Sequence, residues 1–322
     1  VILLWMSGGP SQVHTFTLHQ DGEFKQYQGT QTAVPGIRIS EHLPKLAASM
    51  TDLALIRTMC TGVNVHPQGH YLMHMGYRQG ATDYPTLGAV VAKELGDPAT
   101  PLPSYVNLNA GQLGTGVYSP GALGPNFAPL MVNGKGGVQD LKPADPARDA
   151  ARTELFRAVE GRAADRFQAD AVLAHQASYR KAVELMRTDR TKVFRADDEP
   201  ATLRDEYGKD EFGQGCLMAR RLVEAGVRFV EVSWGGNGGV AWDSHGGGAE
   251  PVMKKSPALD AGFATLIRDL KDRGLLDTTL VIWMGEFGRG PRPGQGGGIN
   301  GGIGSGHFAK CWTTVLAGAG IK

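Results

Sequence analysis

The sequence has few cysteines, no long apolar run and no surplus of charge of either sign. Its 3 cysteines, Cys60, Cys216 and Cys311, are odd in number and widely spaced, so they indicate neither a disulfide framework nor a zinc knuckle. No apolar run approaches the ~18 residues that a transmembrane helix needs. Lys and Arg number 33 against 32 Asp and Glu. Because phosphate binding depends on surplus basic side chains, this balance argues against nucleic acid as a partner.

Glycine, in contrast, is abundant. The chain has 46 glycines among 322 residues, about twice the ~7% of average usage, which predicts long irregular loops. Hydrophobic residues make up 41% and charged residues 20%, enough apolar material for a sizeable core. The length fits one large domain, or one domain with a cap. The chain begins at Val1 inside an apolar run, without a start methionine or a charged leader, so we expect that a segment preceded it.

Short apolar runs alternate with helical patterns along the chain. The strand-like runs are Val1–Met6, Leu53–Met59, Ser104–Leu108, Val227–Trp234, Thr279–Met284 and Trp312–Leu316. The helical patterns between them are Leu87–Leu95, Gly215–Ala225 and Ala258–Asp272. This alternation predicts an α/β fold with a mostly parallel central sheet and helices on both faces.

Two segments interrupt the alternation. Asn109–Lys142 is rich in Gly and Pro and has no clear periodicity, which predicts a functional loop or a cap. Ala150–Arg190 is long, polar and helical. We expect residues 109–190 to form a loop and helical cap inserted into a single domain that spans 1–322. The run Gly294–Gly306 has neither a phosphate-loop lysine nor a following helix, so a flexible lid is its simplest interpretation.

Polar side chains follow the predicted strands, where an open α/β sheet binds its ligands. They are Ser11, His14, His66, His70, Asp243, His245, Glu286 and His307. Carboxylates and imidazoles that converge from several strand ends form the kind of site that holds Zn²⁺ or Mn²⁺. In Asp243-Ser-His245 the alternation of an extended loop would place both ligands on one side. A turn in which Asp243 caps backbone amides is the alternative.

The histidines around residue 70 have two interpretations. His66, His70 and His74 recur at four-residue intervals, which would align them on one face of a helix. Pro67 and Gly69 favour a helix that begins near His70, with His66 in the preceding loop. His74 is then a packed core histidine, and His66 and His70 are the candidates for function.

Three further features bear on the chemistry. Glu286, at the end of a buried strand, needs either a cation or an Arg partner, and Arg289 lies in the same turn. The run Ser7–Gln12 could hold an oxyanion with its backbone amides. His42 and His175 are expected at the surface.

Five motifs, spread in order over the whole chain, resemble those of a known family. They are LWMSGGPSQ (4–12), HYLMHMGYR (70–78), WDSH (242–245), GEFGR (285–289) and GAGIK (318–322). The chain is identified by them as a member of a bacterial, mostly secreted family that carries the label of a domain of unknown function. The family is placed beside the sulfatases in the alkaline phosphatase superfamily.

The resemblance implies a sulfatase-like α/β sheet with a metal cluster at its carboxyl edge. It gives Asp243, His245, Glu286 and His307 the roles of metal ligands. In sulfatases a modified Cys or Ser nucleophile precedes the glycine that closes the next helical turn. The corresponding place in this chain, counted back from Gly76, holds His66, so a sulfatase-type formylglycine is not expected.

The chain departs from the family pattern at two places. It reads His14-Thr-Phe-Thr where the family usually has Asp-Thr-Phe-Asp, and Ser305-Gly306 where the family has Arg-Asp before the late histidine. The loss of three carboxylates weakens a hard two-metal site, because oxygen ligands hold such cations. His14 could still bind a zinc-like ion. The family continues past Lys322, so we expect the chain to be incomplete at both ends.

Two functional hypotheses follow from the residues and the resemblance. The first is a metal-dependent hydrolase of phosphate or sulfate esters, small-molecule or polysaccharide, that uses zinc or manganese, with calcium as an alternative. A bound water or Ser11 would be the nucleophile, His66 and His70 would act in catalysis, and Arg289 would stabilise developing charge together with the Gly8-Gly9 amides. The second is a catalytically inactive protein with a binding or structural role, and a protein partner, in the cell envelope. The family's habit of secretion implies a periplasmic or secreted location.

Overall fold

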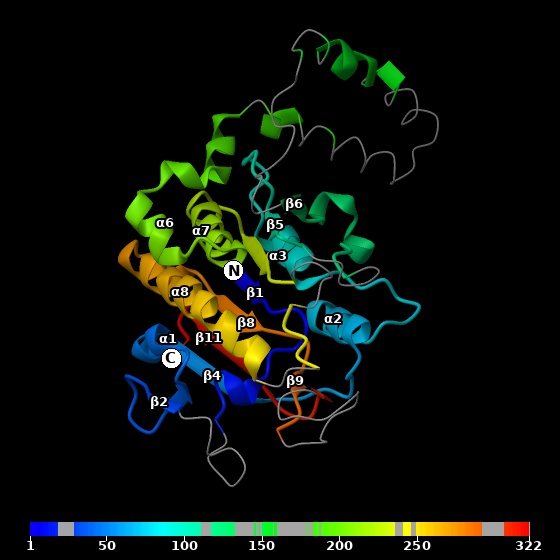
Figure 1. Ribbon diagram of the computed structural model, residues 1–322. Helices are drawn as coiled ribbons and strands as arrows, with labels where there is room; N and C mark the ends of the chain where they lie inside the picture. The colour runs from blue at the N-terminus through cyan, green and yellow to red at the C-terminus, as the bar shows by residue number, and fades with distance from the viewer. Residues whose placement is uncertain are drawn as a thin grey trace.

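The computed structural model is built around a central seven-stranded sheet (Figure 1). It describes residues 1–18, 29–110, 117–132, 145, 148, 150–156, 158–159, 179, 183–186, 188–235, 241–245, 249–291 and 306–321. The strands of the central sheet are β1 (Ile2–Trp5), β4 (Leu53–Met59), β5 (Tyr105–Leu108), β6 (Leu130–Val132), β7 (Phe229–Ser233), β8 (Val281–Met284) and β11 (Trp312–Ala317). Their order is β4-β11-β8-β1-β7-β5-β6. Neighbours from β8 to β6 are parallel, whereas β11 is antiparallel to both β8 and β4.

Helices cover both faces of this sheet. The main helices are α1 (Pro44–Ala48), α2 (His66–Met75), α3 (Leu87–Leu95), α6 (Ala201–Tyr207), α7 (Glu211–Glu224) and α8 (Glu250–Asp272). Alternate side chains of a strand point to opposite faces, and both faces of β1 are buried. Ile2 and Leu4 belong to the core that contains α7 and α8, while Leu3 and Trp5 pack in a second core with α3. Strand β1 is therefore apolar throughout because it lies between two helical layers.

The remaining elements are short. They are β2 (Gly29–Gln31), β3 (Arg38–Ser40), β9 (Gly288–Arg289) and β10 (His307–Phe308), with 3₁₀ turns η1 (Gln12–His14), η3 (Met50–Asp52), η4 (Gly121–Leu123), η5 (Pro125–Phe127), η6 (Asp189–Phe194), η7 (Ala196–Asp198) and η8 (Leu276–Thr278). None of the helices in the described ranges is both long enough and apolar enough to cross a bilayer.

The predicted α/β fold with a mostly parallel sheet is confirmed. Each predicted strand run coincides with a strand of the central sheet, although β11 extends one residue beyond its run, to Ala317, and α3 has the predicted bounds. Two boundaries differ. Helix α8 begins at Glu250 instead of Ala258 and continues through Pro257, and α7 begins at Glu211, where the Asp210 carboxylate accepts hydrogen bonds from the Phe212 and Gly213 amides.

Strand β6 was not predicted, because it lies inside the segment Asn109–Lys142 that shows no periodicity. Its three residues pair with β5 at the edge of the sheet. Most of the predicted helical cap in Ala150–Arg190 lies outside the described residues, and so do residues 294–305 of the glycine run.

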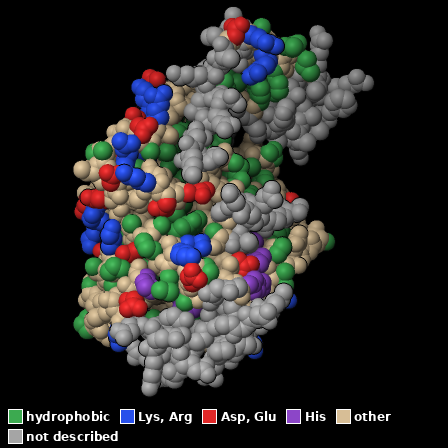
Figure 2. Space-filling view, in the orientation of Figure 1, with side chains coloured by type: hydrophobic (Ala, Val, Ile, Leu, Met, Phe, Trp, Pro, Cys, Tyr) green, Lys and Arg blue, Asp and Glu red, His purple; other side chains and the backbone are tan. Residues whose placement is uncertain are grey.

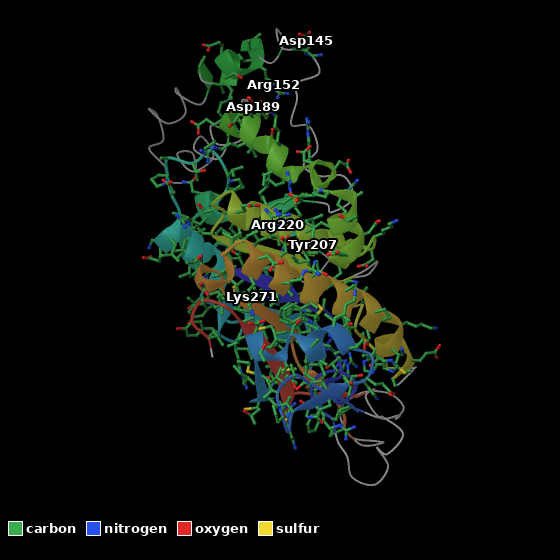
Figure 3. The ribbon with its side chains drawn as sticks, turned by 90° about the vertical axis from the view of Figure 1, so that its left-hand side faces the viewer. Asp145, Arg152, Asp189, Tyr207, Arg220 and Lys271 are labelled. Atoms are coloured by element: carbon green, nitrogen blue, oxygen red, sulfur yellow. The ribbon has the colours of Figure 1, made fainter. Side chains whose placement is uncertain are left out.

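A buried ion network holds the helices of one face together. Arg220 of α7 is 1% exposed and contacts three carboxylates. Its Nε lies 2.8 Å from Asp269 Oδ2, its Nη2 2.8 Å from Glu199 Oε2, and its Nη1 2.6 Å from Glu224 Oε2. Tyr207 of α6 donates a hydrogen bond of 2.9 Å to Asp269 Oδ2. Figure 3 labels Tyr207 and Arg220, which lie near each other on this side of the molecule. The network therefore links α6, α7 and α8.

Candidate metal centre

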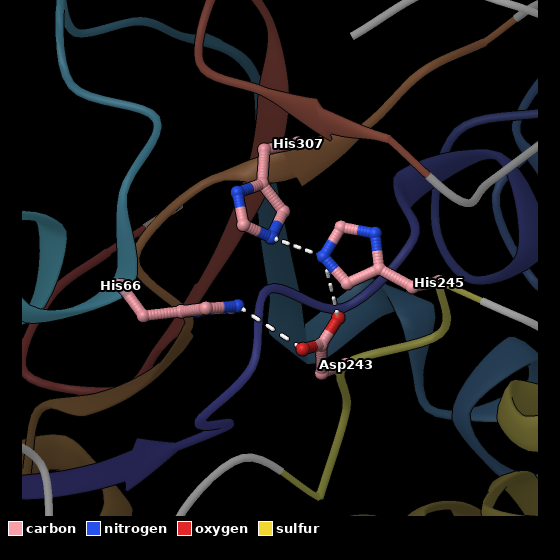
Figure 4. Close-up of side chains that lie close together, drawn as sticks. All are labelled: His66, Asp243, His245 and His307. Carbon is pink, nitrogen blue, oxygen red and sulfur yellow. Dashed lines mark hydrogen bonds and ion pairs between the residues drawn. The ribbon is translucent and has the colours of Figure 1, made fainter. Parts of the chain in front are cut away.

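Four side chains from three parts of the chain meet beyond the strand ends (Figure 4). They are His66 at the start of α2, Asp243 and His245 in the segment after β7, and His307 in β10. One donor atom from each lies within 4.8 Å of the others. Asp243 bridges the group, because its Oδ2 lies 3.3 Å from His66 Nε2 and its Oδ1 lies 3.3 Å from His245 Nε2. His245 Nε2 is 2.7 Å from His307 Nε2.

A second group adjoins the first and shares His66 with it. It consists of His66, His70 and Glu286. Glu286 Oε1 lies 2.6 Å from His66 Nδ1 and 3.5 Å from His70 Nε2, and it also accepts the Gly8 amide at 2.9 Å. The other carboxylate oxygen, Oε2, is buried and has no hydrogen-bond partner among the described residues. A buried carboxylate oxygen in this state calls for a cation or another donor.

Helix α2 begins at His66, so the expectation that it starts near His70 is wrong. Pro67 lies in the first turn, where a missing N–H costs nothing, and Val65 before it is extended. A side chain at position 69 would be crowded, because a Cβ there would lie 3.1 Å from Glu286 Cβ. Glycine at this position lets the helix pass close to the site. One helical turn separates His66 from His70, which places both imidazoles next to the same carboxylate.

The charges of the group differ from one residue to the next. Burial alone would lower the pKa of His66, but the hydrogen bonds to Asp243 and Glu286 raise it to about 9. Burial opposes ionisation of Asp243, yet its hydrogen bond to His66 and the nearby Arg289 charge hold the pKa of this carboxyl well below its usual range. Both carboxylates are therefore ionised at neutral pH.

Two other histidines are neutral at the same pH. Burial lowers the pKa of His70 to about 4, and burial with the nearby Arg289 charge lowers that of His307 to about 4. The Nδ1–H of His307 donates to the Asn64 carbonyl at 2.7 Å, which leaves the Nε2 lone pair directed at His245. A neutral imidazole fixed by a backbone carbonyl is the form that binds metal ions.

Solvent reaches the first group. The side chains of His66, Asp243 and His245 are 17%, 21% and 33% exposed. In the space-filling view, histidine side chains gather beside acidic ones on the same part of the surface (Figure 2). A small molecule can thus approach these donors without unfolding of the sheet.

Arg289 is buried and contacts the Asp243 carboxylate. Its Nη2 donates to Asp243 Oδ1 at 2.7 Å and to the Gly8 carbonyl, and its Nε donates to the Gly9 carbonyl at 3.0 Å. Gly8 has φ +108°, and a Cβ there would lie 2.4 Å from the Asp243 amide nitrogen, so glycine is required. The guanidinium therefore orients Asp243, and the Gly8 amide is engaged by Glu286.

Ser11 and His14 lie outside both groups. Both side chains are buried, and Ser11 Oγ is 2.9 Å from His14 Nδ1. The serine next to the second group is Ser7, whose Oγ lies 3.4 Å from His70 Nε2. In the sequence, Ser7 stood out only as part of the glycine-rich run. Asn64 was not predicted, because it acts through its backbone carbonyl, which leaves no sign in the choice of side chain.

His14 makes the protein sensitive to acid. Burial and the neighbouring His42 lower the pKa of His14 to about 4, below its ordinary 6.5. Stability from the neutral form is thus complete above pH 6.5 and is lost as the pH falls through 6.5 towards 4, by about 3 kcal/mol at most. Urea unfolding at pH 7 and pH 4.5 should show a smaller drop for His14→Asn than for the wild type. Equal drops would contradict this assignment.

The comparisons with known proteins agree with the motifs. The chain matches the family described as "Protein of unknown function (DUF1501)" over residues 1–322. It belongs to this DUF1501 family. No curated protein matches it significantly.

The solved structures similar to this DUF1501 chain include alkaline phosphatases. One is the alkaline phosphatase from the Antarctic bacterium TAB5, at 13% identity and a TM-score of 0.45, with 98% of this chain and 90% of the other covered. Another is a mutant of that enzyme with Mg bound in the M3 site, at 13% identity and a TM-score of 0.43, with coverages of 98% and 89%.

Proposed function

We propose that this DUF1501 protein is a metal-dependent hydrolase of phosphate or sulfate esters. The observation that carries the proposal is the pair of adjacent donor groups that share His66. The first group offers three imidazoles and a carboxylate, a donor set that suits zinc or manganese, with calcium a weaker alternative because it prefers oxygen ligands. The second offers the Glu286 carboxylate with one oxygen unpartnered within the described residues. These residues fit a divalent cation.

A divalent cation held here would polarise an ester oxygen and lower the pKa of a water molecule that it holds. The chain's own residues prepare the site for this. Asp243 and Glu286 supply negative charge, Arg289 orients Asp243, and the Asn64 carbonyl fixes the His307 ring. Ser7 and Ser11 are both 0% exposed, so water is the nucleophile that we favour over a serine hydroxyl.

The substrate reaches the exposed side of the first group. We propose a small-molecule or polysaccharide ester, because the donors His66, Asp243 and His245 are open to solvent from one side. The resemblance to a secreted family supports a periplasmic or extracellular place of action.

The test of this function combines metal content with turnover. Elemental mass spectrometry of the purified protein should find about one or two equivalents of zinc or manganese per chain. The same preparation should hydrolyse members of a panel of aryl phosphates and sulfates, and a chelator should abolish the hydrolysis. A chain without stoichiometric metal or turnover would instead be a binding or structural protein, to be studied through its envelope partner.

A further inference from the structure

Cys60 and Cys311 lie at the adjoining ends of two neighbouring strands. Cys60 directly follows β4 and Cys311 directly precedes β11, and these strands are antiparallel with Met59 opposite Trp312. Beyond this pair the Thr61 amide donates to the Ala309 carbonyl at 2.8 Å, so the two segments stay side by side. Only Cys60 separates Met59 from Thr61, whereas Lys310 and Cys311 separate Ala309 from Trp312, so Cys60 lies across from Lys310 and Cys311.

This arrangement suits a disulfide bond. Residues directly opposite on antiparallel strands have Cα atoms roughly 4.5 to 5.5 Å apart, and each cysteine is the chain neighbour of one member of such a pair, Met59 and Trp312. Disulfides form at Cα separations of about 4.4 to 6.8 Å. Cys60 is exposed and Cys311 is partly exposed, so an oxidant can reach both, whereas Cys216 is buried in the core.

The reduced Cys311 thiol has a competing contact. Its Sγ donates to the Arg57 carbonyl at 3.1 Å. A thiol is a weak donor, so rotation of this side chain about χ1 towards Cys60 loses little.

We propose that Cys60 and Cys311 form an intramolecular disulfide that locks the two segments bearing His66 and His307 together. In the reaction each thiol gives up its proton and one electron, and a bond forms between the two sulfur atoms. A disulfide-bonded thiol compound accepts the two electrons and two protons, and its own S–S bond breaks to give two thiols.

The effect of this disulfide on cation binding rests on the proposed function. Asn64 follows Cys60, and its carbonyl holds His307, which precedes Cys311. A covalent bond between the cysteines restricts the motion of this contact in the unloaded protein. The site then loses less freedom when it binds a cation, so the oxidised form binds more tightly.

Thiol counting tests the bond itself and needs no metal. After incubation with oxidised glutathione and its removal, the wild type should lose two alkylatable thiols and the mass of two hydrogen atoms. Peptide mapping should show Cys60 linked to Cys311, with Cys216 still reduced. Cys60→Ser and Cys311→Ser, the matched controls, should not form this bond. Three free thiols, a mixed disulfide alone, or a bond between two molecules would overturn the proposal.

Zinc titration then tests the coupling. The oxidised wild type should bind zinc about 5-fold or more tightly than the reduced wild type, with Cys60→Ser unchanged by the same treatment. Equal affinities would overturn the locking effect even if the bond forms. If no form binds zinc, the proposed function fails while the thiol count still decides the disulfide.

Discussion

Alanine at both Asp243 and His245 is expected to strip the stoichiometric metal from the protein and to lower ester hydrolysis by more than about 100-fold. Loss of even an outer partner of a metal ligand typically costs about 10 to 100-fold. Asp243 contributes more than one donor atom, because it touches His66 through Oδ2 and His245 through Oδ1. Without it, the charge of the buried Arg289 would also repel a cation.

The measurement is elemental mass spectrometry beside initial rates on the ester panel. His42→Ala with Asp277→Ala is the matched control, since it removes the same two residue types outside both donor groups. The control should keep the metal content and the hydrolysis rate of the wild type. Both double variants should show the wild-type far-ultraviolet circular dichroism spectrum. If the Asp243/His245 variant retains its metal, the donor group does not hold the ion and the proposed hydrolase loses its basis.

The convergence of these residues could be predicted because it follows from the topology of a parallel sheet. Strands β1, β7 and β8 are parallel neighbours, so their carboxyl ends lie at one edge. Residues that follow them, such as Asp243 and Glu286, must then be close in space. The hydrophobic runs that give the strands are strong signals, since both faces of β1 are buried.

The contacts that orient the ligands could not be predicted in the same way. The Asn64 carbonyl that holds His307 is a backbone group, present at every position of the chain. The inward direction of Arg289 depends on Gly8 and Gly9, whose left-handed conformations turn two carbonyls towards it. Such choices are set by three-dimensional packing, which local pattern does not encode.

Glu231 was overlooked although the sequence carried a signal for it. It is a carboxylate within the buried strand β7, and a group of that kind needs partners. His74 Nε2 lies 3.3 Å from Glu231 Oε1, and Ser233 and Tyr105 donate hydrogen bonds to the carboxylate. His74 Nδ1–H donates to the His70 carbonyl at 2.8 Å, so this pair anchors α2 and with it the turn that carries His66 and His70. A core histidine is thus also a structural support for the site.

Replacement of Arg220 by alanine is expected to lower the free energy of unfolding by about 3 kcal/mol. Breaking a buried ion pair by removal of one partner typically costs about 3 to 5 kcal/mol, because the remaining charges stay buried. Here Glu199 and Asp269 would remain, with side-chain exposures of 9% and 7%. Arg273 also contacts both carboxylates, which places the expected loss at the lower end of that range.

Urea unfolding measures this loss. The urea concentration at the midpoint should fall, while the slope of the unfolding free energy against urea should stay unchanged. Arg268→Ala on α8 is the control, because Arg268 and its partner Glu206 are 51% and 49% exposed and such a pair is worth under about 1 kcal/mol. The midpoint of Arg220→Lys should fall between those of Arg220→Ala and Arg268→Ala. Lysine keeps the charge but lacks the planar guanidinium whose N–H groups reach three carboxylates. An Arg220→Ala midpoint equal to that of Arg268→Ala would mean that the network adds nothing beyond solvent-exposed pairs. In that case the helices of this face are held by their apolar contacts alone.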